Sequence, residues 1–126
     1  MSELRQDSTT FDWIIIAKER ARRPHEFMVY KGKPHIPEYE KDCPFCPGNE
    51  EKTPDATAVY GTPDRWRIRV VPNKFAALTP DGDTTKEERS LFRKTHGYGM
   101  HEVVIETAMH NQSIPFMNDD HVQELI

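Results

Sequence analysis

The sequence has little cysteine, no long apolar run and no excess of basic charge. Its 126 residues include two cysteines, and 17 Lys and Arg are outweighed by 21 Asp and Glu, for a net charge of -4. A negative balance argues against a nucleic-acid partner bound mainly through its phosphates. No stretch approaches the run of about 18 apolar residues that a membrane helix needs, so no membrane association is expected.

The first residues, MSELRQDSTTFDW, also lack the apolar core of a secretory signal, and a cytoplasmic location is therefore expected. A disulfide between two cysteines this close in sequence cannot stabilise a domain of this size. In a reducing compartment such a pair is typical of metal binding or catalysis. The ten prolines and 30% charged residues describe a loop-rich protein of about one domain.

Two apolar segments predict strands, and the last residues predict a helix. Residues 12–17 (DWIIIA) form a short apolar run typical of a buried strand. Residues 101–107 (HEVVIET) predict another strand. Asp119 or Asp120 is expected to cap a helix that begins HVQELI.

A further strand is predicted by the alternation in RWRIRVVPN, residues 65–73. Trp66, Ile68 and Val70 point one way, and three arginines point the other way. This pattern predicts an antiparallel strand with one face in solvent. The residues expected on that solvent face are Arg65, Arg67 and Arg69.

Both cysteines, Cys43 and Cys46, lie in one C-x-x-C at the centre of a long loop rich in Pro, Gly and acidic residues, residues 31–55. Two thiolates on a tight turn can present their sulfurs to one tetrahedral zinc ion, which then needs two more ligands. The downstream candidates are His96, His101 and His110.

Two other interpretations of the cysteine pair stay open from spacing alone. CPFC is an acceptable dithiol motif of the glutaredoxin kind, in which the helix N-terminus that follows a strand stabilises the thiolate. Here Pro47, Gly48 and Asn49 follow the pair at once, so no helix is expected to begin there. The cysteines could also be two small core residues without chemistry.

A basic segment follows the first predicted strand. Lys18, Arg20, Arg22 and Arg23 place four positive charges within six residues. Arginine forks suit phosphate oxygens because two parallel donors meet two acceptors. Composition alone favours a solvated basic loop, because clustered charges are common on protein surfaces.

Taken together and in order, five segments resemble the opening part of galactose-1-phosphate uridylyltransferases and their nucleotidyltransferase relatives in the histidine-triad superfamily. The segments are DWIIIAKERARRPHEF, DCPFCPGNEEKTP, RVVPNKFAAL, GYGMHEVVIET followed by MHN, and HVQELI. The resemblance implies an α+β fold with an antiparallel β-sheet and few helices. Residues 1–126 would then be the N-terminal part of a histidine-triad-like half-barrel domain.

The resemblance also implies an activity. Members of this family move a nucleoside monophosphate from a nucleotide sugar to a histidine and then to a hexose 1-phosphate, through a covalent phosphoramidate. UDP-glucose and galactose 1-phosphate are the expected substrates. An adenylyl-transferring relative acting on ADP-glucose remains an alternative, as does a non-catalytic zinc-dependent nucleotide-binding module.

Several residues match functional positions of the family. Zinc is the implied cofactor, and three of its ligands match Cys43, Cys46 and His110. Asn73 matches a nucleotide contact in a P-N-x-F/Y segment. Arg20 and Arg23 match arginines near the phosphates.

The sequence departs from the family at the catalytic position. The family carries its nucleophile and its fourth zinc ligand in a downstream His-Pro-His-Gly-Gln segment, and these 126 residues contain no His-x-His. No catalytic residue is therefore assigned, and the chain is expected to be truncated before that segment. Missing strands would leave an unpaired sheet edge, so a homodimer is a further hypothesis.

Overall fold

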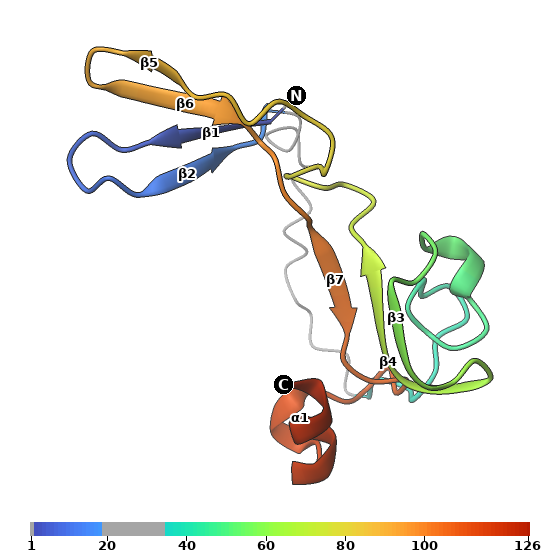
Figure 1. Cartoon of the computed structure of the whole chain (residues 1–126). Helices are drawn as coiled ribbons and strands as arrows, with labels where there is room; N and C mark the ends of the chain where they lie inside the picture. The colour runs from blue at the N-terminus through green and yellow to red at the C-terminus, as the bar shows by residue number, and fades with distance from the viewer. Residues whose placement is uncertain (1, 19–34) are drawn as a thin grey trace. The chain divides into compact units, whose positions relative to one another are not determined.

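The computed structural model describes residues 2–18 and 35–126, and Figure 1 shows its elements. These residues fall into two compact units. The first unit contains residues 2–18 and 75–101, and the second contains residues 35–74 and 102–126. Within these ranges, no helix is long and apolar enough to cross a membrane.

The first unit is a four-stranded antiparallel sheet in the order β2-β1-β6-β5. Its central strand β1 pairs with β2 on one side and with β6 on the other (Figure 1). The strands are β1 (Glu3–Gln6), β2 (Trp13–Ile16), β5 (Glu87–Arg89) and β6 (Phe92–His96).

Strand β2 confirms the strand predicted for residues 12–17, but it is not buried. Trp13, Ile14 and Ile15 remain 38%, 49% and 46% exposed. Consecutive β-branched residues favour the extended backbone, which is why the strand forms. Burial depends on what packs against the strand, and β2 is an edge strand of its sheet. The expectation of a buried strand is therefore wrong.

The second unit contains a three-stranded antiparallel sheet in the order β3-β4-β7, with two short 3-10 helices and α1. Trp66, Val71 and Ile105 form its core cluster, and Val103 and Ala108 pack against them. The elements are β3 (Ala58–Thr62), β4 (Arg65–Pro72), β7 (Glu102–Ile105), η2 (Glu50–Lys52), η3 (Ile114–Phe116) and α1 (Asp119–Leu125).

A β-bulge interrupts the pairing of β3 with β4. Tyr60 pairs with Ile68, whereas the next residue, Gly61, pairs with Trp66, so Arg67 is the extra residue on β4. Gly61 has φ +107, and a Cβ at this position would lie 2.6 Å from a backbone oxygen of β4. A bulge of this kind shifts the alternation of side chains along the strand.

The shifted alternation corrects one prediction for β4. Trp66 and Arg69 lie on the same face, with the guanidinium carbon 5.4 Å from the centroid of the indole ring. Arg69 is buried, at 3% exposed, while Arg65 and Arg67 are exposed as expected. The prediction that all three arginines face solvent is therefore wrong for Arg69. The prediction that Trp66 shares a face with Ile68 and Val70 is also wrong, because the bulge lies between Trp66 and Ile68.

Helix α1 confirms the predicted C-terminal helix, but its cap is a different residue. The side chain of Asn118 accepts a hydrogen bond from the His121 backbone N–H at 2.8 Å. Asp119 and Asp120, predicted as caps, lie instead in the first turn, where acidic side chains interact favourably with the helix dipole.

Two polar contacts attach α1 to the strands of its own unit. The His121 ring Nε2 lies 2.7 Å from the backbone oxygen of Glu106, directly after β7. The guanidinium of Arg67 on β4 forms an ion pair with Glu124. This hydrogen-bonded guanidinium lowers the pKa of the Glu124 carboxyl. None of the helix residues is fully buried, and Val122 and Leu125 are half-buried.

All named strands pair antiparallel, and α1 is the one α-helix in the described parts of the chain, so the expected α+β class is confirmed. Strand β7 confirms the strand predicted for residues 101–107. Sequence patterning does not reveal β1, β3, β5 or β6, because each has three to five residues and no sustained apolar alternation.

Candidate metal centre

The cysteine segment is folded into a tight turn by its own backbone. The Cys46 N–H donates to the Cys43 oxygen at 3.4 Å, and the Asn49 N–H donates to the Cys46 oxygen at 3.2 Å. Gly48 adopts φ +85, a conformation that glycine tolerates without strain. The side-chain amide of Asn49, which is 7% exposed, donates to the backbone oxygens of Lys41 and Cys43 at 3.1 and 2.7 Å.

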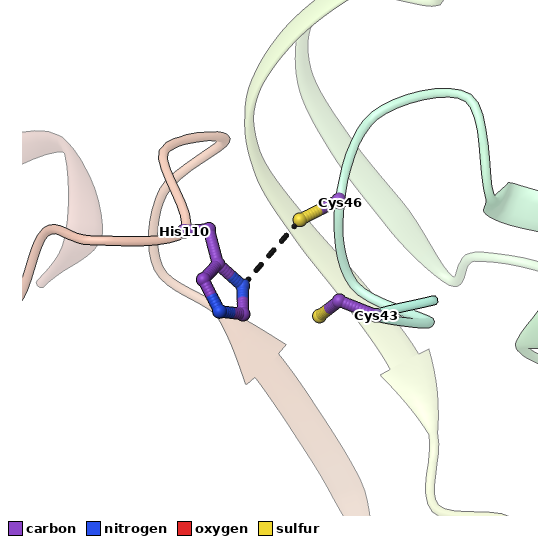
Figure 2. Close-up of side chains that lie close together, drawn as sticks. All are labelled: Cys43, Cys46 and His110. Atoms are coloured by element: carbon purple, nitrogen blue, oxygen red, sulfur yellow. Dashed lines mark hydrogen bonds between the residues drawn. The ribbon is translucent and has the colours of Figure 1, made fainter. Parts of the chain in front are cut away.

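His110 approaches this turn from the segment that follows β7. Its backbone N–H donates to the oxygen of Glu38 at 2.8 Å, which ties the two segments together. The ring Nδ1 lies 3.5 Å from the Cys46 sulfur. Figure 2 shows the imidazole turned toward this sulfur. The ligand atoms of Cys43, Cys46 and His110 all lie within 4.8 Å of one another. The structure therefore brings together the three residues that were expected to bind zinc.

The geometry of this group fits a zinc ion. With bonds of about 2.3 Å to sulfur and about 2.0 Å to nitrogen, a tetrahedral ion separates a sulfur from a nitrogen by roughly 3.5 Å. The Cys46 sulfur and the His110 nitrogen are 3.5 Å apart. Thiolate and imidazole are also the ligand types that zinc prefers. In residues 2–18 and 35–126 no fourth Cys, His, Asp or Glu joins the group.

The redox interpretation fits the site less well. Cys46 is 1% exposed, and burial raises the pKa of its thiol, with the amide hydrogen bond from Glu40 opposing that shift. A redox dithiol needs an accessible sulfur whose pKa is lowered. In this segment η2 begins only at Glu50, so no helix N-terminus faces the cysteines. Both cysteines are free thiols in the structure.

The other two histidines weighed as ligands are not part of this group. His96 ends strand β6 and is exposed. His101 is half-buried, and its Nδ1 accepts a hydrogen bond from the Ala77 backbone N–H at 2.9 Å.

The resemblance implies three nucleotide contacts, and one of these residues, Asn73, lies within the described part of the chain. Arg20 and Arg23 lie outside the described residues, so their place near phosphates stays a prediction. Asn73 follows β4 directly and is half-buried. Its contact with a nucleotide likewise stays a prediction.

Sequence reasoning missed the residues that hold the cysteine segment in place. Trp66 on β4 donates through its indole nitrogen to the Glu50 carboxylate at 2.8 Å, and Arg69 donates to the Thr53 hydroxyl at 2.8 Å. Pro-Gly-Asn indicates a turn after the cysteines. The bonds that the Asn49 amide donates to the Lys41 and Cys43 oxygens span 8 and 6 residues and have no such local signal. No signal existed for Arg69, since its burial follows from the bulge.

The chain belongs to the galactose-1-phosphate uridyl transferase family. The model of that family's N-terminal domain matches residues 1–126. This agrees with the resemblance carried by the five sequence segments.

Among characterised relatives, the chain is 35% identical to ADP-glucose phosphorylase of Arabidopsis thaliana over 114 residues, which is 86% of this chain and 32% of the relative. It is 25% identical to galactose-1-phosphate uridylyltransferase of Thermotoga maritima over 127 residues, 100% of this chain and 33% of the relative. It is 27% identical to the enzyme of the same name from Haemophilus influenzae over 118 residues, 90% of this chain and 32% of the relative. The chain thus spans about a third of the length of these relatives.

A solved structure is similar in fold. The crystal structure of the Arabidopsis thaliana ADP-glucose phosphorylase with bound ADP-glucose superposes with a TM-score of 0.54 at 26% identity, covering 99% of this chain and 34% of that one. The expected fold, that of a histidine-triad-like domain built on antiparallel sheet, is thereby confirmed.

Proposed function

We propose that residues 1–126 form the N-terminal part of a hexose-1-phosphate nucleotidyltransferase whose partners are a nucleotide sugar and a hexose 1-phosphate. The observation that carries this proposal is the family match along the whole chain. In the proposed reaction of the longer protein, a histidine displaces glucose 1-phosphate from UDP-glucose and holds the uridylyl group. Galactose 1-phosphate then takes that group from the histidine.

The histidine nucleophile is proposed to lie beyond these residues. None of the six histidines stands in a His-x-His context. In the described residues, His110 faces the Cys46 sulfur, and His121 contacts a backbone oxygen through its Nε2. His101 accepts a backbone hydrogen bond at Nδ1. These three rings are therefore committed to structural contacts.

A second candidate function is nucleotidyl transfer from ADP-glucose. It is supported by the 35% identity to an ADP-glucose phosphorylase and by the fold match to that enzyme. The two candidates are separated by incubating the longer protein with UDP-glucose and with ADP-glucose, each labelled at the α-phosphate. The substrate is whichever of these two nucleotide sugars transfers an acid-labile label to a histidine of the protein. A protein labelled by neither would be a non-catalytic nucleotide-binding module.

Within this chain, the proposed role of Cys43, Cys46 and His110 is to hold a structural zinc ion. Zinc would supply a cross-link between the cysteine turn and the segment after β7. The side chains themselves already converge, and the His110 N–H and the Glu38 oxygen join the same two segments. The metal site would thus support the nucleotide site without taking part in bond breaking.

Metal analysis of the purified chain tests this role. We expect about one zinc per chain, as for a structural site of this ligand type. Cys43→Ser and Cys46→Ser should each lose most of the metal, whereas His96→Ala should retain it. A wild-type chain without zinc, or Cys43→Ser with the same zinc content as wild type, would contradict the proposed site.

A further inference from the structure

A polar cluster joins the cysteine segment to strand β4. It comprises two side chains from the end of the cysteine segment, Glu50 and Thr53, and two from β4, Trp66 and Arg69. The Trp66 indole N–H donates to the Glu50 carboxylate at 2.8 Å. Arg69 Nη2 donates to the Thr53 hydroxyl at 2.8 Å, and that hydroxyl lies 2.9 Å from the Glu50 backbone oxygen.

The β-bulge at Arg67 makes this cluster possible. In a regular strand, residues three apart point to opposite faces of the sheet. The extra residue brings Trp66 and Arg69 onto one face, where the guanidinium stacks 5.4 Å from the indole centroid. Both side chains are buried, at 4% and 3% exposed. The pair forms the surface on which the segment around Glu50 rests.

The charges in this cluster are incompletely matched. Arg69 Nη1 is buried without a hydrogen-bond partner, and it lies 3.9 Å from the Glu50 carboxylate. Burying a guanidinium carries a large desolvation free energy unless an anion lies close to it. Displacing the segment that carries Glu50 would separate the buried Arg69 guanidinium from the carboxylate that lies close to it. The cluster therefore favours one position of that segment.

The cluster lies next to the ligands in the chain. Glu50 directly follows Asn49, whose N–H donates to the Cys46 oxygen and whose side chain donates to the Cys43 oxygen. A shift at Glu50 is therefore transmitted to both ends of the cysteine turn through Asn49.

We propose that Trp66 and Arg69 are positioning residues for the metal site, acting through Glu50 and Thr53 to hold the two cysteine sulfurs at the spacing a metal ion needs. The inference rests on the proposed zinc site. Their hydrogen bonds go to Glu50 and Thr53 and not to the ligand side chains. Their effect is on the affinity of the site, because a preformed turn does not have to be ordered when the metal binds.

Two mild variants test the proposal. Trp66→Phe keeps an aromatic ring and removes the N–H donor to Glu50, and Thr53→Val removes the hydroxyl at nearly constant volume. Ile105→Val is the control for core packing, since it loosens the same cluster and removes no hydrogen-bonding group. Zinc affinity is measured on the full chain by competition with a chromogenic chelator, at a temperature where every variant is folded.

We expect both cluster variants to bind zinc roughly tenfold more weakly or worse, the range seen when outer-shell partners of metal ligands are removed. Ile105→Val should bind it as wild type does. Unchanged affinity in both cluster variants, or an equal loss in Ile105→Val, would overturn the proposal. The second outcome would mean that affinity follows general stability.

A metal-independent measurement separates this inference from the zinc proposal. In the metal-free chain, alkylation of buried Cys46 is compared with alkylation of half-buried Cys43 by mass spectrometry. We expect Trp66→Phe and Thr53→Val to raise the labelling of Cys46 relative to Cys43. Absence of zinc from the wild-type chain would reject the proposed metal site. An unchanged ratio of Cys46 to Cys43 labelling in both variants would reject the proposed positioning role of Trp66 and Arg69.

Discussion

The indole N–H of Trp66 and the carboxylate of Glu50 are joined by a hydrogen bond of 2.8 Å between strand β4 and the 3-10 helix η2. This bond links the core of the second unit to the segment that carries both cysteines. Trp66 also packs in the core cluster with Val71 and Ile105. One side chain therefore connects the packing of the sheet to the geometry of the candidate metal centre.

Acidification should release this link. Burial by itself raises the pKa of the Glu50 carboxyl, but the hydrogen bond from Trp66, backbone hydrogen bonds and the nearby Arg69 charge outweigh it and hold the pKa below its ordinary value. A carboxyl whose pKa is lower when folded adds stability above its unfolded pKa of about 4.3. That contribution is lost as the pH falls through the lower, folded value.

We therefore expect the fluorescence of Trp66 to change below about pH 4 in the metal-free chain, before the rest of the unit unfolds. The measurement uses a Trp13→Phe background, so that Trp66 is the sole tryptophan. Glu50→Gln should show the altered emission already at neutral pH and no acid transition. An acid transition of unchanged midpoint in Glu50→Gln would assign the effect to another carboxyl.

Removing the cap of α1 should loosen that helix. Asn118→Ala deletes the acceptor for the His121 N–H, and loss of an N-cap costs about 0.5 to 2 kcal/mol. Hydrogen exchange of the helix amides should accelerate accordingly. Asp119→Ala, at a position that sequence alone assigns as a cap, should have the smaller effect. A larger effect from Asp119→Ala would show that the cap was misassigned.

Binding of UDP should depend on the basic segment of residues 18–23. If Arg23 faces the phosphates, Arg23→Ala should weaken binding by roughly 1.5 to 3 kcal/mol, the range for hydrogen bonds to charged groups. Arg65→Ala, an exposed arginine on β4, should change it little. Titration calorimetry on the longer protein gives both values. Equal losses in the two variants would reject a specific role for Arg23.

By itself, the chain should form no covalent nucleotidyl intermediate. Covalent catalysis requires a nucleophile positioned among its supporting groups, and displacement by about 1 Å can cost a hundredfold in rate. Incubation with UDP-glucose labelled at the α-phosphate should leave no acid-labile label on the protein. Label that disappears when one of the six histidines is replaced would make this chain a minimal enzyme.

Much of the framework was predictable from local patterns. The isoleucine run, the alternation in β4 and the apolar residues of β7 each identify a strand, because strand preference is read over a few neighbouring residues. The spacing of Cys43 and Cys46 pointed to a metal, and the resemblance supplied His110. The structure then brought all three together.

The features that escaped prediction depend on residues far apart in the sequence. Arg69 is buried because a bulge opposite Gly61 turns its side chain toward η2. The local amino-acid pattern of β4 does not predict a bulge. Trp13 and its neighbours in β2 are exposed because β2 is a sheet edge. Asn118 caps α1 although two aspartates follow it, a choice that depends on backbone geometry at the helix start.

The central claim, that Cys43, Cys46 and His110 bind one zinc ion, is tested most directly by X-ray absorption at the zinc edge on the purified chain. The account predicts two sulfur ligands at about 2.3 Å and nitrogen or oxygen ligands at about 2.0 to 2.2 Å. His110→Ala should reduce the nitrogen contribution and leave both sulfurs in place. A first shell without sulfur, or a shell that His110→Ala leaves unchanged, would contradict the account.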